Sequence, residues 1–156
     1  MRLLLQRVSR AEVRVEGAVA GRIGRGLVAL VGVGHDDTAM VARTLARRTT
    51  ELRIFPDDAG RTNRSLIDVG GAVLAVSQLT LYADTSRGRR PSFLGAAPPA
   101  QGERLYGVYA DELASLGVQV ERGVFGARME VDLVNEGPFT IWLDLDERPA
   151  SVAGTP

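Results

Sequence analysis

The feature that most constrains the fold is the unbroken apolar run Leu27-Val28-Ala29-Leu30-Val31-Gly32-Val33. A strand with one solvent-facing side alternates polar and apolar residues, whereas a strand buried on both sides does not. The run is also far shorter than the roughly 20 apolar residues that a membrane-spanning helix needs. It therefore predicts a central strand that other elements cover on both faces.

Alternating apolar residues and turn signals predict further strands around this run. Near the start of the chain, Glu16-Gly17-Ala18 and Gly24-Arg25-Gly26 supply the turns. The expected strands are Leu3–Val8, Glu12–Glu16, Val19–Ile23, a strand that ends at Ser77, Val118–Val124, Met129–Val134 and Phe139–Leu145.

Two helices are expected between these strands. Asp36-Asp37-Thr38 is typical of a helix N-terminus, and an apolar stripe continues to about residue 53. A second helix presents Leu105, Tyr109 and Leu113 on one face and ends at Gly117. We expect an α+β fold with a curved mixed sheet or open β-barrel and two main helices. Residues 1–146 are expected to form one domain, and residues 147–156 a disordered tail.

The composition excludes several kinds of site. The 156 residues include no cysteine and a single histidine, His35, so thiol catalysis, disulfides and sites with several imidazoles are impossible. The 19 cationic residues, all arginine, equal the 19 acidic ones, which argues against a strongly basic nucleic-acid binder. Arg87, Arg89 and Arg90 are the one local concentration and are interpreted as a solvated loop. With no signal peptide at its start, the chain is expected to be cytoplasmic, without cofactor or metal.

Three tempting motifs fail on inspection. The glycines of 21–26 precede a strand rather than a helix, so a hairpin turn is favoured over a dinucleotide-binding loop. His35-Asp36-Asp37 lies where a strand enters a helix, so capping is favoured over a metal site or an acid–base pair. Ser77 has neither a Gly-x-Ser-x-Gly elbow nor a nearby histidine. An ester hydrolase built on this chain would therefore work largely by positioning and backbone electrostatics.

Two polar insertions interrupt the apolar runs. Ser77-Gln78-Leu79-Thr80 follows the apolar run 72–76, and Asn135-Glu136-Gly137-Pro138-Phe139-Thr140 lies between two further apolar runs. An unpaired buried polar group costs on the order of 1–3 kcal/mol, so such groups must find partners or do work. Proline cannot donate to a sheet ladder, and glycine lets a backbone or ligand approach closely. Both insertions are therefore candidate functional segments.

These insertions resemble the two signature motifs, Ser-Gln-x-Thr and Asn-x-Gly-Pro-x-Thr, of the D-aminoacyl-tRNA deacylase family, which includes D-tyrosyl-tRNA(Tyr) deacylase. Other segments that fit the family are Gln6–Val8, Arg53–Phe55, Gly70-Gly71, Ala83–Thr85, Arg90–Phe93 and Leu133–Asn135. The resemblance runs from residue 1 to about residue 145. Leu79 departs from the pattern, because many members carry phenylalanine there, and packing around the substrate could differ.

The resemblance implies a homodimer that hydrolyses the ester bond of D-aminoacyl-tRNA, releasing free D-amino acid and tRNA in chiral proofreading. The Gly137-Pro138 pair, in the cis form, would enter the site of the other subunit. Its fixed carbonyls would contact the amino group of the substrate and leave no volume for an L side chain. The implied partner is the acceptor end of aminoacylated tRNA. Removal of glycine mischarged on tRNA(Ala) is left open.

The resemblance also assigns residue roles. The catalytic candidates are Thr80, Ser77, Gln78 and Leu79, and the substrate-binding candidates are Gly137, Pro138, Asn135, Thr140, Arg7 and Phe125. Backbone N–H groups of Leu79 and Thr80 would form an oxyanion hole. The Thr80 hydroxyl is either a nucleophile or an orienting group; orientation is favoured because no base is close in sequence, with the ribose 2′-hydroxyl assisting. Arg7 would brace the Gly-Pro loop, and Phe125 would flank the amino acid or the terminal adenosine.

Two other interpretations stay open. The chain could be a nucleic-acid-binding module of the same fold without deacylase activity, although its neutral charge and the lack of a basic tail oppose this. It could also be an interaction protein with a decayed site, which the intact polar residues of both motifs oppose.

Overall fold

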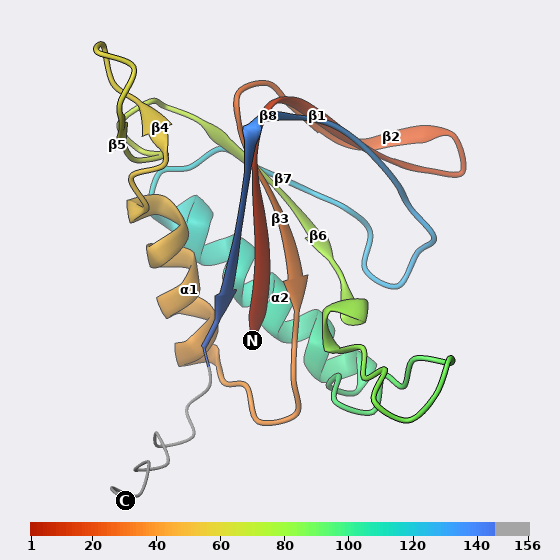
Figure 1. The fold of residues 1–156 in the computed structure, drawn as a ribbon. Coiled ribbons are helices and arrows are strands. Elements are labelled where there is room, and N and C mark those ends of the chain that lie inside the picture. The colour runs from red at the N-terminus through yellow and green to blue at the C-terminus, as the bar shows by residue number, and fades with distance from the viewer. Residues whose placement is uncertain (146–156) are drawn as a thin grey trace, which may run out of the picture.

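Strand β1 (Arg2–Val15) lies at the centre of the fold and is paired along both edges. The computed structural model describes residues 1–145 (Figure 1). One edge of β1 pairs antiparallel with β2 (Ala18–Ile23) and with β3 (Gly26–Gly32), and the other edge pairs antiparallel with β8 (Glu130–Asp144). Because β1 pairs with all three strands, its register sets the positions of β2, β3 and β8 relative to one another.

The sheet continues beyond β3 with parallel strands. β6 (Ala72–Ser77) pairs with β3, and β7 (Val120–Arg122) pairs with β6, both in parallel. The sheet curls until β2 approaches β7, since a Cβ at Gly21 would lie 3.0 Å from the carbonyl oxygen of Arg122. A separate small hairpin consists of β4 (Phe55–Pro56) and β5 (Thr62–Arg64). The predicted curved mixed sheet is confirmed.

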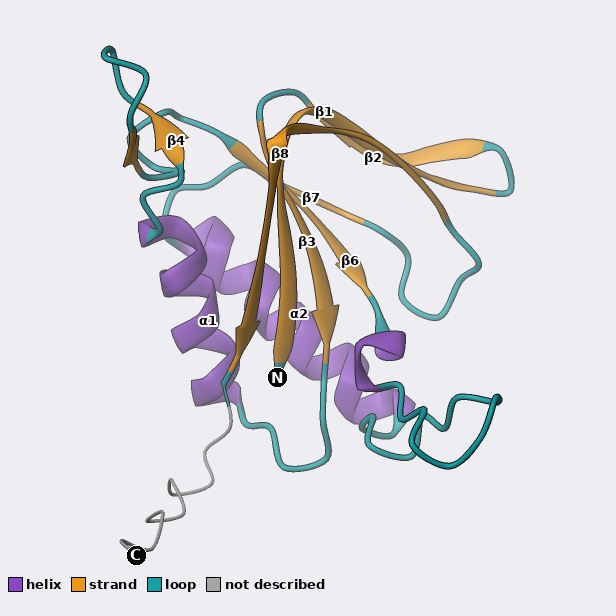
Figure 2. Cartoon of the chain, viewed as in Figure 1, coloured by secondary structure: helices purple, strands orange, loops and turns teal. Residues whose placement is uncertain are grey.

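The two predicted helices are also confirmed, and both lie behind the central strands (Figure 2). Helix α1 (Ala39–Glu51) is capped by Thr38, whose Oγ1 accepts a hydrogen bond from Val41 N at 3.3 Å. Helix α2 (Pro99–Ser115) begins with proline, which lacks an N–H that would otherwise be unpaired. A short 3₁₀ turn, η1 (Leu79–Tyr82), follows β6. Among the described residues, no helix has the length and apolarity that crossing a bilayer requires.

Two apolar cores flank the sheet, and β1 contributes to both. Leu3 and Leu5 pack into the core under the helices, whereas Val8, Ala11 and Val13 pack into the core inside the curled sheet. Simple alternation would return residues 11 and 13 to the face of Leu3 and Leu5. The pairing with β8 shifts register between Val8 and Arg10, and such an irregularity reverses the alternation. β1 thereby joins the two cores.

Several expected element boundaries are wrong. β1 and β8 are each one long strand, not two, because the two strands pair with each other on both sides of the irregular residues. Gly24-Arg25 is a bend between β2 and β3, both of which pair with β1, whereas the hairpin turn lies at Glu16-Gly17. The small β4–β5 hairpin is a further element that was not among the expected strands. The tail predicted over 147–156 lies outside the described residues.

The contact between β3 and β6 predicts a sharp difference between two neighbouring glycines. A Cβ at Gly26 would lie 1.8 Å from the carbonyl oxygen of Ala72, on the backbone of the paired strand. Gly26→Ala is therefore expected to lower the free energy of unfolding by at least about 2 kcal/mol. Gly24→Ala is the matched control, because nothing lies within 4 Å of its Cβ position. Denaturant unfolding of both variants measures this, and equal stability would contradict the packing described.

Candidate active site

The first motif lies where the buried strand β6 leaves the sheet. The N–H of Gln78 donates to the carbonyl oxygen of Val31 at 2.8 Å, which holds the start of the motif against β3. The chain then turns into η1, with Leu81 N donating to the carbonyl oxygen of Gln78 at 3.2 Å. Strand, anchor and turn together fix the backbone from Ser77 to Thr80.

The start of η1 presents backbone donors and two polar side chains. The first N–H groups of a helical turn have no acceptor within the turn, and here they belong to Leu79 and Thr80. The side-chain amide of Gln78 donates to Thr80 Oγ1. Leu79 and Thr80 are exposed, while Ser77 and Gln78 are half-buried. The turn therefore offers a pair of N–H donors beside a hydroxyl whose orientation is set by a neighbouring amide.

A pocket of about 420 Å³ opens beside this turn and contains no formal charge. Its lining residues are Val31, Val33, Val76, Ser77, Gln78, Leu79, Thr80, Ala96, Ala97, Pro99, Gly102, Tyr106, Phe125, Gly126, Ala127, Met129 and Val131. We call it the neutral pocket, because no carboxylate, imidazole or guanidinium lines it. All four residues of the first motif and Phe125 therefore meet at one site.

Tyr106 is the one titratable group that lines the neutral pocket. Its hydroxyl donates to the carbonyl oxygen of Ala75 at 2.7 Å. Burial raises the pKa of Tyr106 to about 12, with nearby Arg122 opposing the shift. The phenol therefore stays protonated at neutral pH and cannot serve as a base there.

The far wall of the pocket depends on a glycine within α2. A Cβ at Gly102 would lie 3.3 Å from Cζ of Phe125, so the absence of a side chain lets this ring lie against the helix. The ring of Phe125 is tilted by 42° to that of Tyr106, with centroids 6.1 Å apart. The sequence analysis missed both Gly102 and Tyr106. The isolated glycine was the usable signal, because a glycine inside a helix costs about 1 kcal/mol and commonly has a packing reason.

The second motif forms a bulge in β8. On the ladder, Gln6 pairs with Thr140 and Val8 pairs with Asn135, so residues 136–139 stand opposite Arg7 alone. Within the bulge, the Gly137-Pro138 peptide is cis and Gly137 has a φ of +131°, a region that favours glycine. Residues 136, 137 and 138 are exposed. We call residues 136–139 the Gly-Pro loop.

Hydrogen bonds from Asn135 and Arg7 hold the Gly-Pro loop. Asn135 Oδ1 accepts from Phe139 N at 3.0 Å, and Asn135 Nδ2 donates to Thr140 Oγ1 at 3.0 Å. Arg7 Nε donates to the carbonyl oxygen of Glu136 at 3.2 Å, and Arg7 Nη1 donates to that of Ile54 at 2.7 Å. The guanidinium also lies 4.8 Å from the centroid of the Phe139 ring. The loop is therefore exposed yet fastened at both ends.

The structure does not bring the two motifs together within the described part of one chain. Ser77, Gln78, Leu79 and Thr80 line the neutral pocket, but no residue of the Gly-Pro loop does. Arg7, Asn135 and Thr140 likewise belong to the β1–β8 ladder rather than to the pocket. The predicted residues thus form two separate groups.

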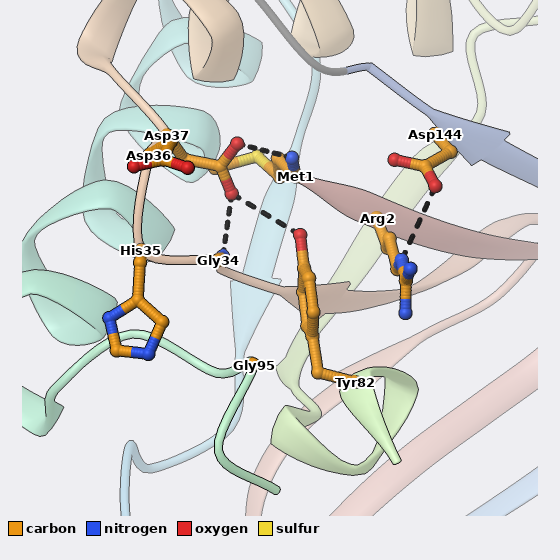
Figure 3. Close-up of a pocket in the computed structure, with 9 residues that line it drawn as sticks. All are labelled: Met1, Arg2, Gly34, His35, Asp36, Asp37, Tyr82, Gly95 and Asp144. Atoms are coloured by element: carbon orange, nitrogen blue, oxygen red, sulfur yellow. Dashed lines mark hydrogen bonds and ion pairs between the residues drawn. The ribbon is translucent and has the colours of Figure 1, made fainter. Parts of the chain in front are cut away.

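The segment His35-Asp36-Asp37 is part of a different, polar pocket of about 310 Å³ (Figure 3). Asp37 forms an ion pair with the Met1 amino group, and its Oδ2 accepts from Gly34 N at 2.6 Å. His35 Nε2 lies 2.6 Å from the carbonyl oxygen of Leu94. The N-cap of α1 is Thr38, which confirms the helix N-terminus predicted at Asp36-Asp37-Thr38, although neither aspartate caps the helix as expected.

Comparison with known proteins gives concordant matches. The model of the family described as D-Tyr-tRNA(Tyr) deacylase matches residues 4–144. A protein of Thermomicrobium roseum named D-aminoacyl-tRNA deacylase is 57% identical over 147 residues, which cover 94% of this chain and 96% of that protein.

Two solved structures share the fold. One, titled c-Myc DNA Unwinding Element Binding Protein, has a TM-score of 0.88 and 35% identity, covering 94% of this chain and 99% of the other. The second, titled as a probable eukaryotic D-amino acid tRNA deacylase, has a TM-score of 0.82 and 20% identity, covering 92% and 98% of the two chains. At that identity, the second likeness concerns the fold alone.

Proposed function

This chain belongs to the D-Tyr-tRNA(Tyr) deacylase family, and on that premise we propose that its neutral pocket hydrolyses the ester bond of D-aminoacyl-tRNA. It is a hydrolase that releases the free D-amino acid and the tRNA. The observation that carries the proposed mechanism is the pair of backbone N–H groups at the start of η1, beside a pocket with no charged side chain. Such donors suit an ester carbonyl, on which negative charge develops during hydrolysis.

The proposed reaction uses main-chain donors and water. Water adds to the ester carbon while Leu79 N–H and Thr80 N–H donate to the carbonyl oxygen, which becomes the oxyanion of the tetrahedral intermediate. Collapse breaks the bond to the ribose oxygen, which takes up the proton that the attacking water lost. Removal of one such donor typically slows a reaction about a hundredfold or more. The adjacent ribose 2′-hydroxyl is placed to relay the proton.

Thr80 orients water and substrate in this mechanism and does not attack the ester. A hydroxyl nucleophile needs a neighbouring base, and no residue that lines the neutral pocket can be one at neutral pH. The contact from the Gln78 amide fixes the Thr80 oxygen as an acceptor, which leaves its proton free to point toward a bound group. Ser77 and Gln78 support the turn, and Phe125 flanks the amino acid or the terminal adenosine.

The Gly-Pro loop completes the site of a second subunit in our proposal. The loop is exposed and fastened, but it reaches no residue of the neutral pocket in its own chain. Near it, β8 exposes two large apolar side chains: Val134 and Trp142 are 40% and 47% exposed. Apolar side chains gathered on one strand are typical of a surface that a partner covers. A homodimer would cover this strand and deliver the loop.

Chirality would be read by the loop backbone. A Cβ at Gly137 would lie 3.0 Å from Phe139 N and 3.2 Å from Arg7 Nη2, so this position tolerates no side chain without rearrangement. Carbonyl oxygens of a loop held by Asn135 and Arg7 can accept from the amino group of the substrate, while the loop occupies the volume of an L side chain. Charged tRNA is used in the cytoplasm, where we place the protein.

Stereospecific deacylation is the direct test of the function. We expect D-tyrosyl-tRNA to be hydrolysed on the order of a hundredfold faster, or more, than L-tyrosyl-tRNA, because only the L side chain meets the loop. A chelator should leave the rate unchanged, since no three His, Asp or Glu side chains gather within the described residues. Release of labelled tyrosine measures both rates. Equal rates on the two esters would refute the proposal.

The role of Thr80 can be separated from that of the backbone. Loss of a nucleophile should slow the reaction roughly ten-thousandfold or more. We expect Thr80→Ala to retain activity well above that limit and Thr80→Ser to restore most of the rate. Substrate whose terminal ribose lacks the 2′-hydroxyl should be cleaved poorly by the unaltered enzyme. Capture of an acyl-enzyme on Thr80 during turnover would overturn the mechanism.

Mixed dimers test whether the site is shared. Thr80→Trp fills the mouth of the neutral pocket, and Gly137→Val forces the exposed Gly-Pro loop to rearrange. Circular dichroism and denaturant unfolding should show that both variants keep the sheet, since neither position is in the buried core. Each should be inactive alone. Random pairing of the two should restore about a quarter of the normal number of sites. Each restored site combines the intact pocket of a Gly137→Val subunit with the intact loop of a Thr80→Trp subunit. If the mixture stays inactive, or if the unaltered protein is active as a monomer, the shared site is wrong.

A further inference from the structure

We propose that the arginine loop, residues 84–92, binds backbone phosphates of the tRNA 3′ strand while the ester lies in the neutral pocket. This inference rests on the proposed function and adds a second site to it. The loop follows η1 directly, and it protrudes from the lower right of the molecule beside the N-terminal end of α2 (Figure 1). Its place in the fold sets it beside the reacting end of the substrate.

The arginine loop borders a pocket of about 670 Å³ whose lining is cationic. Arg2, Arg87 and Arg90 line it, against a single carboxylate, Asp84. Guanidinium groups match phosphate oxygens with paired donors and carry their charge at every physiological pH. Because the whole chain is neutral, this local excess is a property of the pocket and not of the protein as a whole.

Two of these arginines are uncommitted. Arg87 and Arg90 are exposed, and within the described residues neither makes a hydrogen bond or an ion pair. Asp84, by contrast, is already occupied, since its Oδ1 accepts from Ser86 N at 2.9 Å, and hydrogen bonds from Ser86 hold the pKa of Asp84 below its usual value. The carboxylate therefore helps to shape the loop, and the two guanidinium groups remain available to a ligand.

The loop is held closed, so the arginines are not on a free tail. Asp84 N donates to the Ser92 carbonyl oxygen at 2.8 Å, and Ser92 N donates to the Asp84 carbonyl oxygen at 2.9 Å. At its base, Arg2 Nη1 donates to the carbonyl oxygen of Leu81 at 2.8 Å, and the Arg2 guanidinium lies 4.3 Å from the centroid of the Tyr82 ring. Arg2 is thus fixed at the foot of the pocket, and because it is paired with Asp144, the unpaired positive charge of the pocket comes from Arg87 and Arg90.

The neighbouring polar pocket does not share this character. There Asp37 pairs with the Met1 amino group, and Arg2 pairs with Asp144 at 3.3 Å. In Figure 3 the ring of Tyr82 stands between Arg2 on one side and the His35–Asp37 segment on the other. Paired charges and three aspartates make that pocket a poor anion site, so the phosphate site is confined to the side of the arginine loop.

The spacing of the two pockets fits one strand of nucleic acid. Leu79 and Thr80 line the neutral pocket, whereas Tyr82 lines the cationic one, so η1 is the wall between them. A 3₁₀ turn rises about 2 Å per residue, so Tyr82 lies about 4 Å from Thr80 and about 6 Å from Leu79 along the turn. A stacked strand advances roughly 3.4 Å per nucleotide. Phosphates within a few nucleotides of the ester would therefore reach the arginine loop.

A comparison of long and short substrates tests the site. The double variant Arg87→Gln with Arg90→Gln should lower kcat/KM for D-tyrosyl-tRNA by about tenfold or more at low salt. The slope of log(kcat/KM) against log[salt] should shrink by about 1.4, the value for two lost phosphate contacts on a single strand. D-Tyrosyl-adenosine has the ester but no phosphate, so its kcat/KM should be the same with the double variant and the unaltered protein. The ratio of kcat/KM for D-tyrosyl-tRNA to kcat/KM for D-tyrosyl-adenosine should therefore fall at least about tenfold.

Arg43→Gln is the matched control, because Arg43 is equally exposed and without a partner among the described residues but lies on α1. It should leave the tRNA rate and the salt slope unchanged. An unaltered tRNA rate and slope in the double variant would refute the phosphate site, as would an equal loss on tRNA and on D-tyrosyl-adenosine. If the unaltered protein hydrolysed neither D-ester, the proposed function itself would fail, which is a distinguishable result.

Discussion

The pairing of β1 along both edges is the constraint on which both functional segments depend. Through β3, β1 sets the position of β6, whose end carries the residues of the first motif. Through β8, it sets the position of the Gly-Pro loop. The loop forms because four residues of β8, 136–139, stand opposite a single residue of β1, Arg7. The register shift between Val8 and Arg10 also directs Ala11 and Val13 into the inner core. A change in the register of β1 would therefore displace both motifs together.

The absence of charge from the neutral pocket determines which kind of catalysis is available there. In surroundings of low polarity, a backbone N–H stabilises a developing oxyanion more strongly than it would in water. The same surroundings raise the pKa of Tyr106 and so deny the pocket a phenolate base. Donors that are fixed before the substrate arrives need no reorganisation during the reaction. The hydrogen bond from Gln78 N–H to the Val31 carbonyl oxygen, at the end of β6, holds these donors in place.

The sequence predicted those features that local pattern determines. The run Leu27–Val33 gave β3, and helical periodicity gave α1 and α2, because burial of one face repeats along each element. The continuity of β1 was not predictable, since Ser9-Arg10 breaks its alternation and only pairing with β8 bridges the break. Polar motif residues stand out among apolar runs, so their segments were found. Phe125 was predicted from the resemblance, but Tyr106 was missed because an apolar residue that lines a pocket is indistinguishable in sequence from one in the core.

Hydrolysis and chiral selection make different demands, and in the proposed mechanism they fall to different surfaces of the fold. An ester carbonyl bonded to two N–H groups is the same in either enantiomer, so the turn at Leu79 and Thr80 cannot by itself distinguish D from L. The described residues that line the pocket in one chain include no carbonyl or side chain of the Gly-Pro loop. Under the shared-site proposal, discrimination arrives only with the Gly-Pro loop of a partner. A single subunit that was active without the loop would hydrolyse L-aminoacyl-tRNA as well as the D-ester. If hydrolysis depends on assembly of the dimer, the L-ester is protected from such a subunit.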